Sequence, residues 1–272
     1  MRRKQKGDPP RLSIVTGGSR GLGWALAEQL ARHGSDLVLV ARDPSRLEAT
    51  ASQLADAHGV DVEIVPLDLS LPESPERLFD ALDRKGLIAD TLINNAGFNV
   101  YGRFEESDLE QELRMLNLHL VATTHLTKLF LRRRDRTRRN RILIVSSIAA
   151  LVPGPAVSVH FATRAHLLSF SLALSEEFSG ADVDVTCLCP GPMKTEFFER
   201  ASMSDVRLVS GWPIKSMTPE DVAAIGFDAL MSGRPMVVPG WRNRLFALAA
   251  NLAPRPLRVR FARWIMDQAG AG

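Results

Sequence analysis

Short apolar runs alternate with helix-like stretches along most of the chain. The apolar runs lie at 12–16, 36–41, 60–67, 91–93, 142–145, 183–188 and 236–238. Apolar residues with helical spacing fill the intervals at 24–34, 46–58, 75–85, 105–134 and 219–232, and a further long helical stretch ends at Phe178. Strands that alternate with helices at this spacing predict an α/β protein with a doubly wound parallel sheet in a single domain.

Three segments fall outside this alternation. Residues 1–10 form a basic N-terminal extension, and the irregular residues 196–217 are expected to contact substrate. In the tail at 241–272, an apolar helix at 244–252 precedes a second helix whose apolar face, ringed by arginines, consists of Leu257, Phe261, Trp264 and Ile265. We interpret the tail as a helix pair that packs on the domain or on a partner subunit, and peripheral attachment to an anionic membrane is the alternative.

The composition is that of an ordinary folded protein, with 45% hydrophobic and 24% charged residues among 272. The net charge is only +3 and the arginine-rich turn at 132–141 lacks aromatic residues, so we expect no nucleic-acid partner. No apolar run approaches the ~18 residues of a membrane span. The basic N-terminus also lacks the apolar core of a signal peptide, and we expect a cytoplasmic protein. Cys187 and Cys189 lie in an apolar strand, where we expect reduced, buried thiols and no metal site.

Two glycine-containing motifs follow predicted strands. Residues 16–23 read TGGSRGLG and open a helix, where glycines let the backbone approach a pyrophosphate at the positive helix end. Residues 94–97 read NNAG. The spacing TGxxxGxG followed by NNAG resembles the classical short-chain dehydrogenase/reductase family over residues 11–240. The resemblance implies a Rossmann-like domain that binds a nicotinamide dinucleotide.

The resemblance also assigns roles to individual residues. It makes Asn117 the helix asparagine of the family's catalytic tetrad. We interpret His119 and His125, on the same predicted helix, as helix-face residues. The implied cofactor-binding set covers the phosphate loop, the adenine contact after the third strand, the NNAG motif and the PGxxxT motif at the nicotinamide end: Gly17, Ser19, Arg20, Gly21, Leu22, Gly23, Asp68, Leu69, Asn94, Ala96, Gly97, Pro190, Gly191, Met193 and Thr195.

The end of the second strand indicates which nicotinamide cofactor binds. Enzymes that use NAD carry a carboxylate there, which accepts a hydrogen bond from the ribose 2′-hydroxyl. Here the position is Ala41, followed by Arg42, and Arg20 adds a second cation nearby. Because guanidinium groups pair with phosphate, we expect NADP(H). Asp43, one residue further on, opposes this prediction slightly.

The catalytic set departs from the family pattern. Ser147 is followed by His160 and Arg164 at the positions where the family has tyrosine and lysine. Arg164 keeps the positive charge and could hold the ribose hydroxyls, but it cannot relay a proton. We expect the neighbouring arginine and partial burial to keep His160 neutral, which makes it a poor proton donor.

Three functions remain open on this pattern. The first is an NADP(H)-dependent oxidoreductase that interconverts a carbonyl and a secondary alcohol on a bulky apolar substrate, with the catalytic residues Ser147, His160, Arg164 and Asn117. The second is an NADP(H)-binding pseudo-enzyme without redox turnover. The third is a non-redox enzyme that uses His160 as acid or base in an elimination or cyclisation. The resemblance also implies a homodimer or homotetramer, formed through the two long helices.

Overall fold

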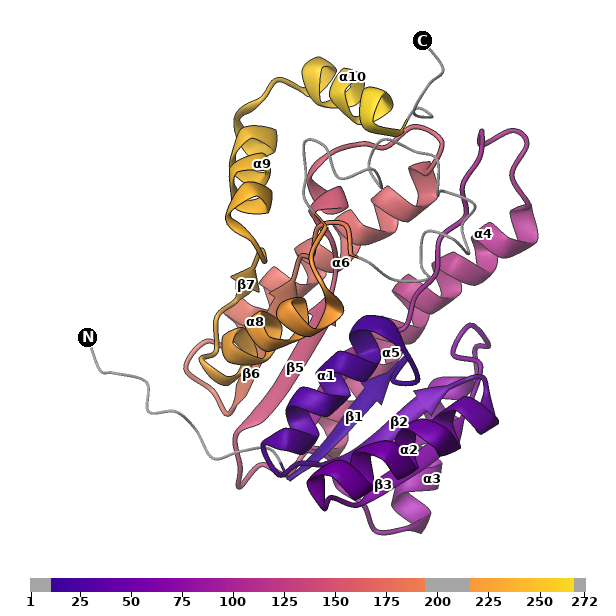
Figure 1. The fold of residues 1–272 in the computed structure, drawn as a ribbon, viewed down its shortest axis with the longest axis vertical. Coiled ribbons are helices and arrows are strands. Elements are labelled where there is room, and N and C mark those ends of the chain that lie inside the picture. Colours follow the sequence, from indigo (N-terminus) through magenta and orange to yellow (C-terminus); the bar gives the residue numbers. More distant parts are fainter. Residues whose placement is uncertain (1–10, 194–215, 267–272) are drawn as a thin grey trace.

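Parallel strands form the centre of the protein (Figure 1). The computed structural model describes residues 11–193 and 216–266. Within these ranges the sheet has seven strands in the order β3-β2-β1-β4-β5-β6-β7. The strands are β1 (Leu12–Thr16), β2 (Asp36–Ala41), β3 (Val62–Pro66), β4 (Thr91–Asn94), β5 (Asn140–Val145), β6 (Val183–Leu188) and β7 (Met236–Val237). The extension at 1–10, Thr195 and all of the predicted substrate segment except Ser216 and Met217 lie outside the described residues.

Helices cover both faces of the sheet. The helices α1 (Gly21–Arg32), α2 (Pro44–His58) and α8 (Pro219–Met231) share one apolar core with the sheet. The helices α3 (Ser74–Arg84), α5 (Thr123–Arg133) and α6 (Ser158–Glu177) share the other. Neighbouring strand residues such as Ile14 and Val15 belong to opposite cores, because successive side chains of a strand point to opposite faces. The predicted doubly wound α/β fold is confirmed.

The helix predicted at 105–134 begins later and is not uniform. Asp108 caps α4 (Leu109–Leu116), because its carboxylate accepts hydrogen bonds from the backbone N–H groups of Glu110 and Gln111. A π-helical turn, η1 (Asn117–Ala122), then joins α4 to α5. A π turn holds more residues than an α-helical turn, so it changes which side chains point toward the sheet.

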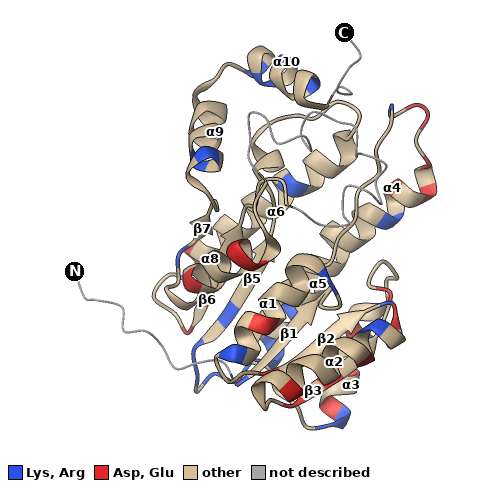
Figure 2. Cartoon of the chain, in the orientation of Figure 1, with Lys and Arg blue, Asp and Glu red and all other residues tan. Residues whose placement is uncertain are grey.

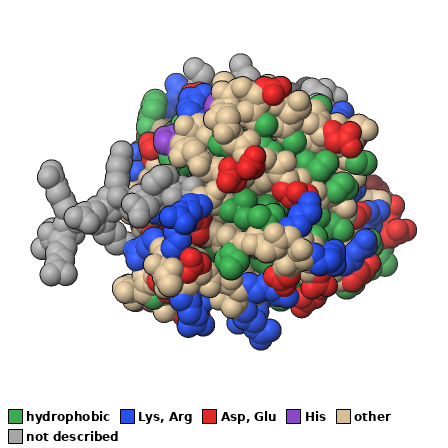
Figure 3. Space-filling view, turned by 90° about the horizontal axis from the view of Figure 1, so that it is seen from below, with side chains coloured by type: hydrophobic (Ala, Val, Ile, Leu, Met, Phe, Trp, Pro, Cys, Tyr) green, Lys and Arg blue, Asp and Glu red, His purple; other side chains and the backbone are tan. Residues whose placement is uncertain are grey.

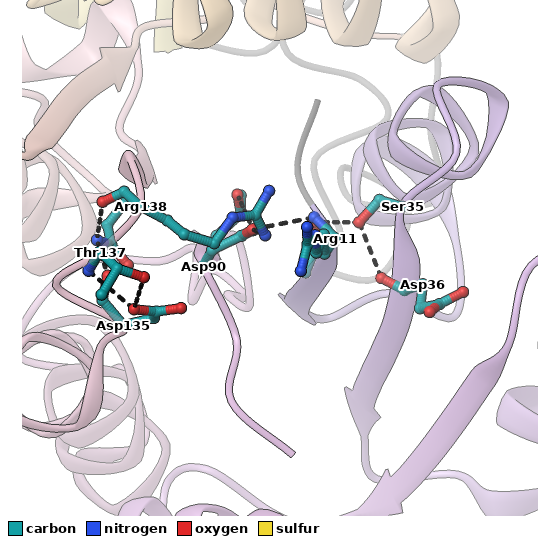
Figure 4. Close-up of polar contacts among 10 residues, drawn as sticks. Arg11, Ser35, Asp36, Asp90, Asp135, Thr137 and Arg138 are labelled. Atoms are coloured by element: carbon teal, nitrogen blue, oxygen red, sulfur yellow. Dashed lines mark hydrogen bonds and ion pairs between the residues drawn. The ribbon is translucent and has the colours of Figure 1, made fainter. Parts of the chain in front are cut away.

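A polar cluster closes the amino end of the sheet (Figure 4). The buried carboxylate of Asp90 accepts hydrogen bonds from the backbone N–H of Arg11 at 3.0 Å and from the Arg138 guanidinium at 2.6 Å. Burial lowers the pKa of Arg141, also in this region, and Asp184 and Asp90 act in the opposite direction.

The molecular surface seen from below intersperses hydrophobic, acidic and basic side chains (Figure 3).

The tail adds two helices beyond the sheet. These are α9 (Trp241–Leu252) and α10 (Arg255–Met266), which lie at one end of the molecule (Figure 1). Their inner faces pack against a short 3-10 helix, η2 (Ile148–Leu151), and against the start of α6, forming a third apolar core. In the parts of the chain described here, no helix is long and apolar enough to cross a membrane.

Candidate active site

The glycine loop between β1 and α1 leaves no room for a side chain at Gly17 or Gly23. Gly17 has φ +67°, a conformation that favours glycine. At Gly23 a Cβ would lie 2.0 Å from the carbonyl oxygen of Gly17. Arg20 occupies the N-cap position of α1 without a capping side-chain hydrogen bond, and Leu22 is buried in the core below. A dinucleotide pyrophosphate fits this surface, since backbone N–H groups at the start of a helix bind anions.

The hydroxyl of Thr16 joins this loop to the NNAG motif. It accepts hydrogen bonds from the backbone N–H groups of Asn95 at 2.9 Å and Ala96 at 3.0 Å. It donates to the carbonyl of Ile93 at 3.1 Å. The buried Asn94 side chain instead donates to Thr127 of α5 at 3.1 Å. The carboxyl ends of β1 and β4 are therefore held in a fixed relation beside the glycine loop.

A pocket of about 330 Å³ lies at the carboxyl end of β2, and its lining residues are Ser19, Arg20, Ala41, Arg42, Asp43 and Arg46. The Asp43 carboxylate caps α2 by accepting from the backbone N–H of Arg46 at 3.2 Å, and it pairs with the Arg46 guanidinium at 3.4 Å. The one carboxylate of the lining is thus already engaged, and three guanidinium groups surround the space. Arg46, one turn into α2, was missed by the sequence analysis.

Asp68 follows β3 and both of its carboxylate oxygens are engaged. Oδ1 accepts from the backbone N–H and the hydroxyl of Ser70 at 3.0 and 2.7 Å, and Oδ2 accepts from Arg114 of α4 at 2.7 Å. Burial raises the pKa of Asp68, but the hydrogen bonds from Ser70 and the charges of Arg114 and Arg42 outweigh this and lower it overall. The adjacent Leu69 is buried in the core. Asp68 is therefore an ionised and fixed carboxylate at neutral pH.

Ser147 is placed at the N-cap of η2. Its hydroxyl oxygen accepts from the backbone N–H of Ala149 at 3.1 Å. The hydroxyl donates to the carbonyl of Pro190 at 3.3 Å, a long hydrogen bond, and that carbonyl also accepts from the backbone N–H of Ile148 at 2.9 Å. The hydroxyl proton can turn to another acceptor without leaving a buried group unsatisfied, because Pro190 keeps its second partner.

His160 and Arg164 are both buried on one side of α6, as their spacing of four predicts. Arg164 Nη1 donates to the carbonyl of Val145 at 3.0 Å, at the end of β5. The backbone carbonyl of Arg164 accepts from the Ser146 hydroxyl at 2.8 Å. Burial lowers the pKa of Arg164 to about 10, so the guanidinium remains charged at neutral pH.

His119, from the π turn, completes this group. Its Nε2 accepts hydrogen bonds from the Arg164 Nη2 and from the backbone N–H of Phe98, both at 3.3 Å. Nδ1 is therefore the protonated nitrogen, and it donates to the Thr163 hydroxyl at 2.9 Å. Thr163 donates in turn to the carbonyl of His160 at 2.7 Å. A single neutral tautomer of His119 satisfies every one of these contacts.

Both imidazoles are neutral at physiological pH. Burial lowers the pKa of His160 well below its usual value, Arg164 lowers it further, and a hydrogen bond with the backbone of Phe98 opposes these effects. Burial, Arg164 and His160, in that order, likewise lower the pKa of His119. The two rings lie edge to face with centroids 5.7 Å apart. The prediction that His160 is neutral is confirmed.

The glycine of the NNAG motif permits this packing. A Cβ on Gly97 would lie 2.8 Å from both Arg164 Nη2 and His119 Nε2. The interpretation of His119 as a helix-face residue is wrong, because the side chain is 1% exposed and contacts the catalytic candidates. His125 does lie near the surface, where it pairs with Glu76 at 3.2 Å. Asn117 is half-buried, and within the described residues no polar contact joins its side chain to this group.

The segment after β6 connects the site to the tail. A Cβ on Gly191 would lie 2.6 Å from the amide nitrogen of Asn243, a buried residue of α9. That amide donates to the carbonyl of Pro239 at 2.7 Å. Met193 forms a parallel bridge with Met217. The start of α9 is therefore held directly against the residues that the family resemblance placed at the nicotinamide end.

Comparison with known proteins agrees with this arrangement. Residues 11–205 match the family model described as short chain dehydrogenase. A very-long-chain 3-oxoacyl-CoA reductase-like protein of Arabidopsis thaliana is 32% identical over 255 residues, which cover 89% of this chain and 77% of the relative. The 3-oxoacyl-[acyl-carrier-protein] reductase of Aquifex aeolicus is 30% identical over 186 residues, which cover 68% of this chain and 75% of that one.

A solved structure shows the same fold. A short-chain dehydrogenase from Sphingobium yanoikuyae in complex with NADPH is 30% identical and superimposes with a TM-score of 0.78, covering 88% of this chain and 91% of that chain. Several curated relatives are longer proteins, and the matches cover between 60% and 77% of the length of the eight compared. The family model, the sequence relatives and the solved structure agree, and the chain belongs to the short-chain dehydrogenase/reductase family of oxidoreductases.

Proposed function

We propose that the protein is an NADP(H)-dependent oxidoreductase that interconverts a carbonyl and a secondary alcohol on a bulky apolar substrate. The observation that carries this proposal is the pocket at the end of β2, where Arg20, Arg42 and Arg46 converge beside Ser19. A ribose 2′-phosphate is the part of the cofactor that needs such a cationic pocket. The carboxylate of Asp43 is a weak argument for NAD, because it already accepts a hydrogen bond from the start of α2 and pairs with Arg46 instead of facing a free ribose hydroxyl.

The rest of the cofactor would occupy the carboxyl edge of the sheet. We assign its pyrophosphate to the glycine loop, its adenine to the Asp68–Leu69 turn and its nicotinamide half to the segments after β4 and β6. When bound, NADPH supplies the hydride for carbonyl reduction. The proposed contacts are Gly17, Ser19, Arg20, Gly21, Leu22, Gly23, Arg42, Asp68, Leu69, Asn94, Ala96, Gly97, Arg164, Pro190, Gly191, Met193 and Thr195.

The catalytic residues would act on the carbonyl oxygen, where negative charge develops. Ser147 can turn its hydroxyl proton from the Pro190 carbonyl toward that oxygen. His160 is a weaker donor, because the single N–H of its neutral ring is already hydrogen-bonded to the backbone of Phe98. A neutral imidazole also gives up its proton far less readily than a phenol whose pKa a lysine has lowered. We therefore propose slow turnover, with polarisation by Ser147 making the larger contribution.

We assign to His119 the positioning of Arg164. The imidazole accepts from the guanidinium and fixes it against the end of β5, while Thr163 fixes the imidazole tautomer. In this proposal His119 takes the place in the tetrad that the sequence analysis gave to Asn117. Since Arg164 is fully enclosed, its charge acts on the site through a medium of low dielectric constant.

An acyl chain is the substrate that the surroundings favour. The third apolar core, next to His160 and Ser147, includes Val152, Phe161 and Met266. Both curated relatives described above are named for 3-oxoacyl thioesters. We therefore propose a 3-oxoacyl thioester as the first substrate to test, and a steroid-like or polyketide-like ketone as the second.

Two other functions have an observation in their favour. The Arg164 guanidinium donates to Val145 and His119, and this arrangement favours a nucleotide-binding protein without redox turnover. The low pKa of His160 favours a non-redox enzyme in which the neutral imidazole removes a proton, in an elimination or cyclisation.

We also propose a homodimer or homotetramer that uses α6. Its outer side exposes several small residues together with one histidine and one leucine, and the small residues let two helices approach closely: Ala162, Ala165, His166, Ser169, Leu172 and Ala173. The thiols of Cys187 and Cys189 lie 3.6 Å apart and are not linked, which supports a cytoplasmic location. We further propose peripheral contact of the tail with a membrane surface, independently of the reductase function, and no nucleic-acid partner.

The test combines cofactor binding with turnover. Calorimetry on the full chain should show NADPH binding at least about tenfold tighter than NADH, because a charge-assisted phosphate contact contributes roughly 1.5–3 kcal/mol. NADPH oxidation is then followed with 3-oxoacyl-CoA substrates of increasing chain length. The double variant His160→Tyr/Arg164→Lys should raise the rate by roughly a hundredfold, the contribution of a well-matched general acid.

Other outcomes select the alternatives. Tight NADPH binding without oxidation, even in the double variant, indicates the pseudo-enzyme. Product that forms at constant NADPH absorbance, and is lost in His160→Ala, indicates the non-redox enzyme. Equal affinity for NADH and NADPH contradicts the assignment of the β2 pocket.

A further inference from the structure

The tail has an inner and an outer face, and both are mostly apolar. The inner face is buried: Asn243, Ala247 and Ala250 of α9 and Ala262, Ile265 and Met266 of α10. It packs on η2 and on Phe161, the neighbour of His160. This packing completes the domain and accounts for only one side of each helix.

The outer face of α9 consists of large side chains that no described residue of the domain covers. Trp241, Leu245, Leu248 and Leu252 recur at intervals of four, three and four residues, and therefore form one stripe along the helix. They are 66%, 57%, 58% and 78% exposed, and Leu257 at the start of α10 is 55% exposed. A continuous stripe of this kind on a soluble domain indicates an interaction surface.

Charge around the stripe indicates what covers it. From Trp241 to Met266 the chain has six arginines and no aspartate, glutamate or lysine. Figure 2 shows the same contrast, with blue but no red on α9 and α10. The charge of these two helices alone exceeds the net charge of the whole chain, +3. Five of the arginines are exposed: Arg242, Arg244, Arg255, Arg260 and Arg263.

We propose that α9 and α10 dock the protein on an anionic lipid surface. The apolar stripe would lie at the level of the lipid headgroups, where tryptophan is favoured, and the arginines would pair with lipid phosphates. Arg242 already stacks on the Trp241 ring at 5.3 Å, which keeps a cation beside the anchoring aromatic residue. A second copy of the chain fits less well, because two such tails would bring their arginines together.

Docking through this face has a consequence for the active site. The inner sides of the same helices border Phe161 and η2, next to His160 and Ser147. An acyl substrate dissolved in the bilayer would therefore reach the site from the membrane side, without transfer through water. This consequence rests on the proposed reductase function, whereas the docking itself does not.

The docking test uses the full chain and vesicles. Cosedimentation is measured with phosphatidylcholine alone and with phosphatidylcholine containing about one quarter phosphatidylserine, a composition typical of anionic membranes. We expect binding to the anionic vesicles, binding at least about tenfold weaker to the neutral ones, and a decrease with added salt. The variants Leu245→Gln/Leu248→Gln and Arg255→Gln/Arg260→Gln should each reduce binding at least about tenfold.

The matched control variants replace equally exposed residues elsewhere in the chain. Phe104→Gln/Ile88→Gln removes side chains that are 66% and 62% exposed, and Arg32→Gln/Arg132→Gln removes two exposed arginines. Both should bind vesicles as the wild type does, and thermal melting checks that all variants fold. Equal binding to neutral and anionic vesicles, or binding unchanged in the tail variants, overturns the proposal. The proposal is also overturned if the wild type does not bind vesicles and light scattering shows an oligomer that dissociates to monomers in the Leu245→Gln/Leu248→Gln variant.

Turnover separates this inference from the proposed function. A short, water-soluble 3-oxoacyl substrate should be reduced equally by the wild type and by Leu245→Gln/Leu248→Gln. A long-chain substrate held in anionic vesicles should be reduced at least about tenfold more slowly by the variant. Vesicle binding without turnover of either substrate supports docking and contradicts the reductase. Turnover of both at equal rates supports the reductase and contradicts delivery from the membrane.

Discussion

At the scale of single residues, the departures from the family pattern support one another. Arg164 is too large and too permanently charged to occupy a lysine position without new partners, and His119 supplies one of them at 3.3 Å. Gly97 makes room for both side chains. His160, without an acidic proton of its own, sits beside a guanidinium that keeps it neutral. The group therefore differs from a Tyr–Lys pair in its acid strength as well as in its shape.

The burial of two neutral histidines predicts how stability depends on pH. Native His119 and His160 have pKa values well below that of an unfolded histidine, so below about pH 6.5 the unfolded state binds more protons. The contribution of these two histidines to the free energy of unfolding should therefore be constant above about pH 7.5 and fall on acidification, by up to about 1.4 kcal/mol per pH unit for each histidine. Urea unfolding between about pH 5 and pH 7.5 measures this slope.

A variant assigns the slope to its source. His119→Asn should remove about half of the decrease, whatever its own effect on stability at neutral pH. His166→Asn, at an exposed position on α6, is the matched control and should keep the wild-type slope. A slope that stays unchanged in His119→Asn contradicts the assignment.

Arg42 should determine which cofactor is preferred. The variant Arg42→Ala removes a guanidinium from the pocket at the end of β2, and the dissociation constant for NADPH should rise roughly ten- to a hundredfold. NADH affinity should change little, because NADH has no 2′-phosphate. Arg32→Ala, at the exposed end of α1, serves as the control in the same calorimetric titration. Equal weakening of both cofactors would instead indicate a general role in folding the loop.

At the scale of secondary-structure elements, hydrophobic spacing is enough to place His119 on the buried face of its helix. Met115, His119, Ala122 and Leu126 are all buried and lie three or four residues apart, so the pattern already placed His119 on the inward face. Asn117, two residues earlier, falls on a different side. The π turn could not be predicted, because it depends on backbone hydrogen bonds that the packing of α4 and α5 decides.

The junction of β1 and β4 is an element whose strength can be measured. Thr16→Val keeps the shape of the side chain but removes one hydrogen bond that Thr16 donates and two that it accepts. We expect a loss of about 2–3 kcal/mol in the free energy of unfolding, at roughly 1 kcal/mol per hydrogen bond. Urea denaturation should show a much smaller effect for Thr91→Val, since that hydroxyl makes one bond at 3.2 Å, to Asp90. Similar losses in the two variants would contradict the role given to Thr16.

At the scale of the whole molecule, the two ends of the sheet have different tasks. The carboxyl end holds the glycine loop, the cationic pocket and the buried histidines, whereas the amino end is closed by Asp90 with Arg11 and Arg138 (Figure 4). Parallel strands place all of their carboxyl ends at one edge, so loops there can change without disturbing the opposite edge. Stability and ligand binding should therefore respond to different mutations.

Asp90→Asn tests this separation. The substitution removes the buried carboxylate charge from the ion pair with the largely buried Arg138, and about 3 kcal/mol of stability should be lost. The dissociation constant for NADPH should stay within about twofold of wild type, because the residue lies at the amino edge. Asp56→Asn, at an exposed position of α2, should alter neither quantity. A large loss of NADPH affinity in Asp90→Asn would show that the two ends are coupled.

The amino-acid sequence by itself determined the order of strands and helices, the glycine loop, the family, and the replacement of tyrosine and lysine by His160 and Arg164. These features are local in the chain, since periodicity and short motifs depend only on neighbouring residues. Tertiary structure alone decided that Arg46 joins the β2 pocket, that His119 meets Arg164 and that α9 presents an apolar face which no described residue covers. Each of these depends on distances between segments far apart in sequence, or on which side of a helix the packed domain leaves exposed.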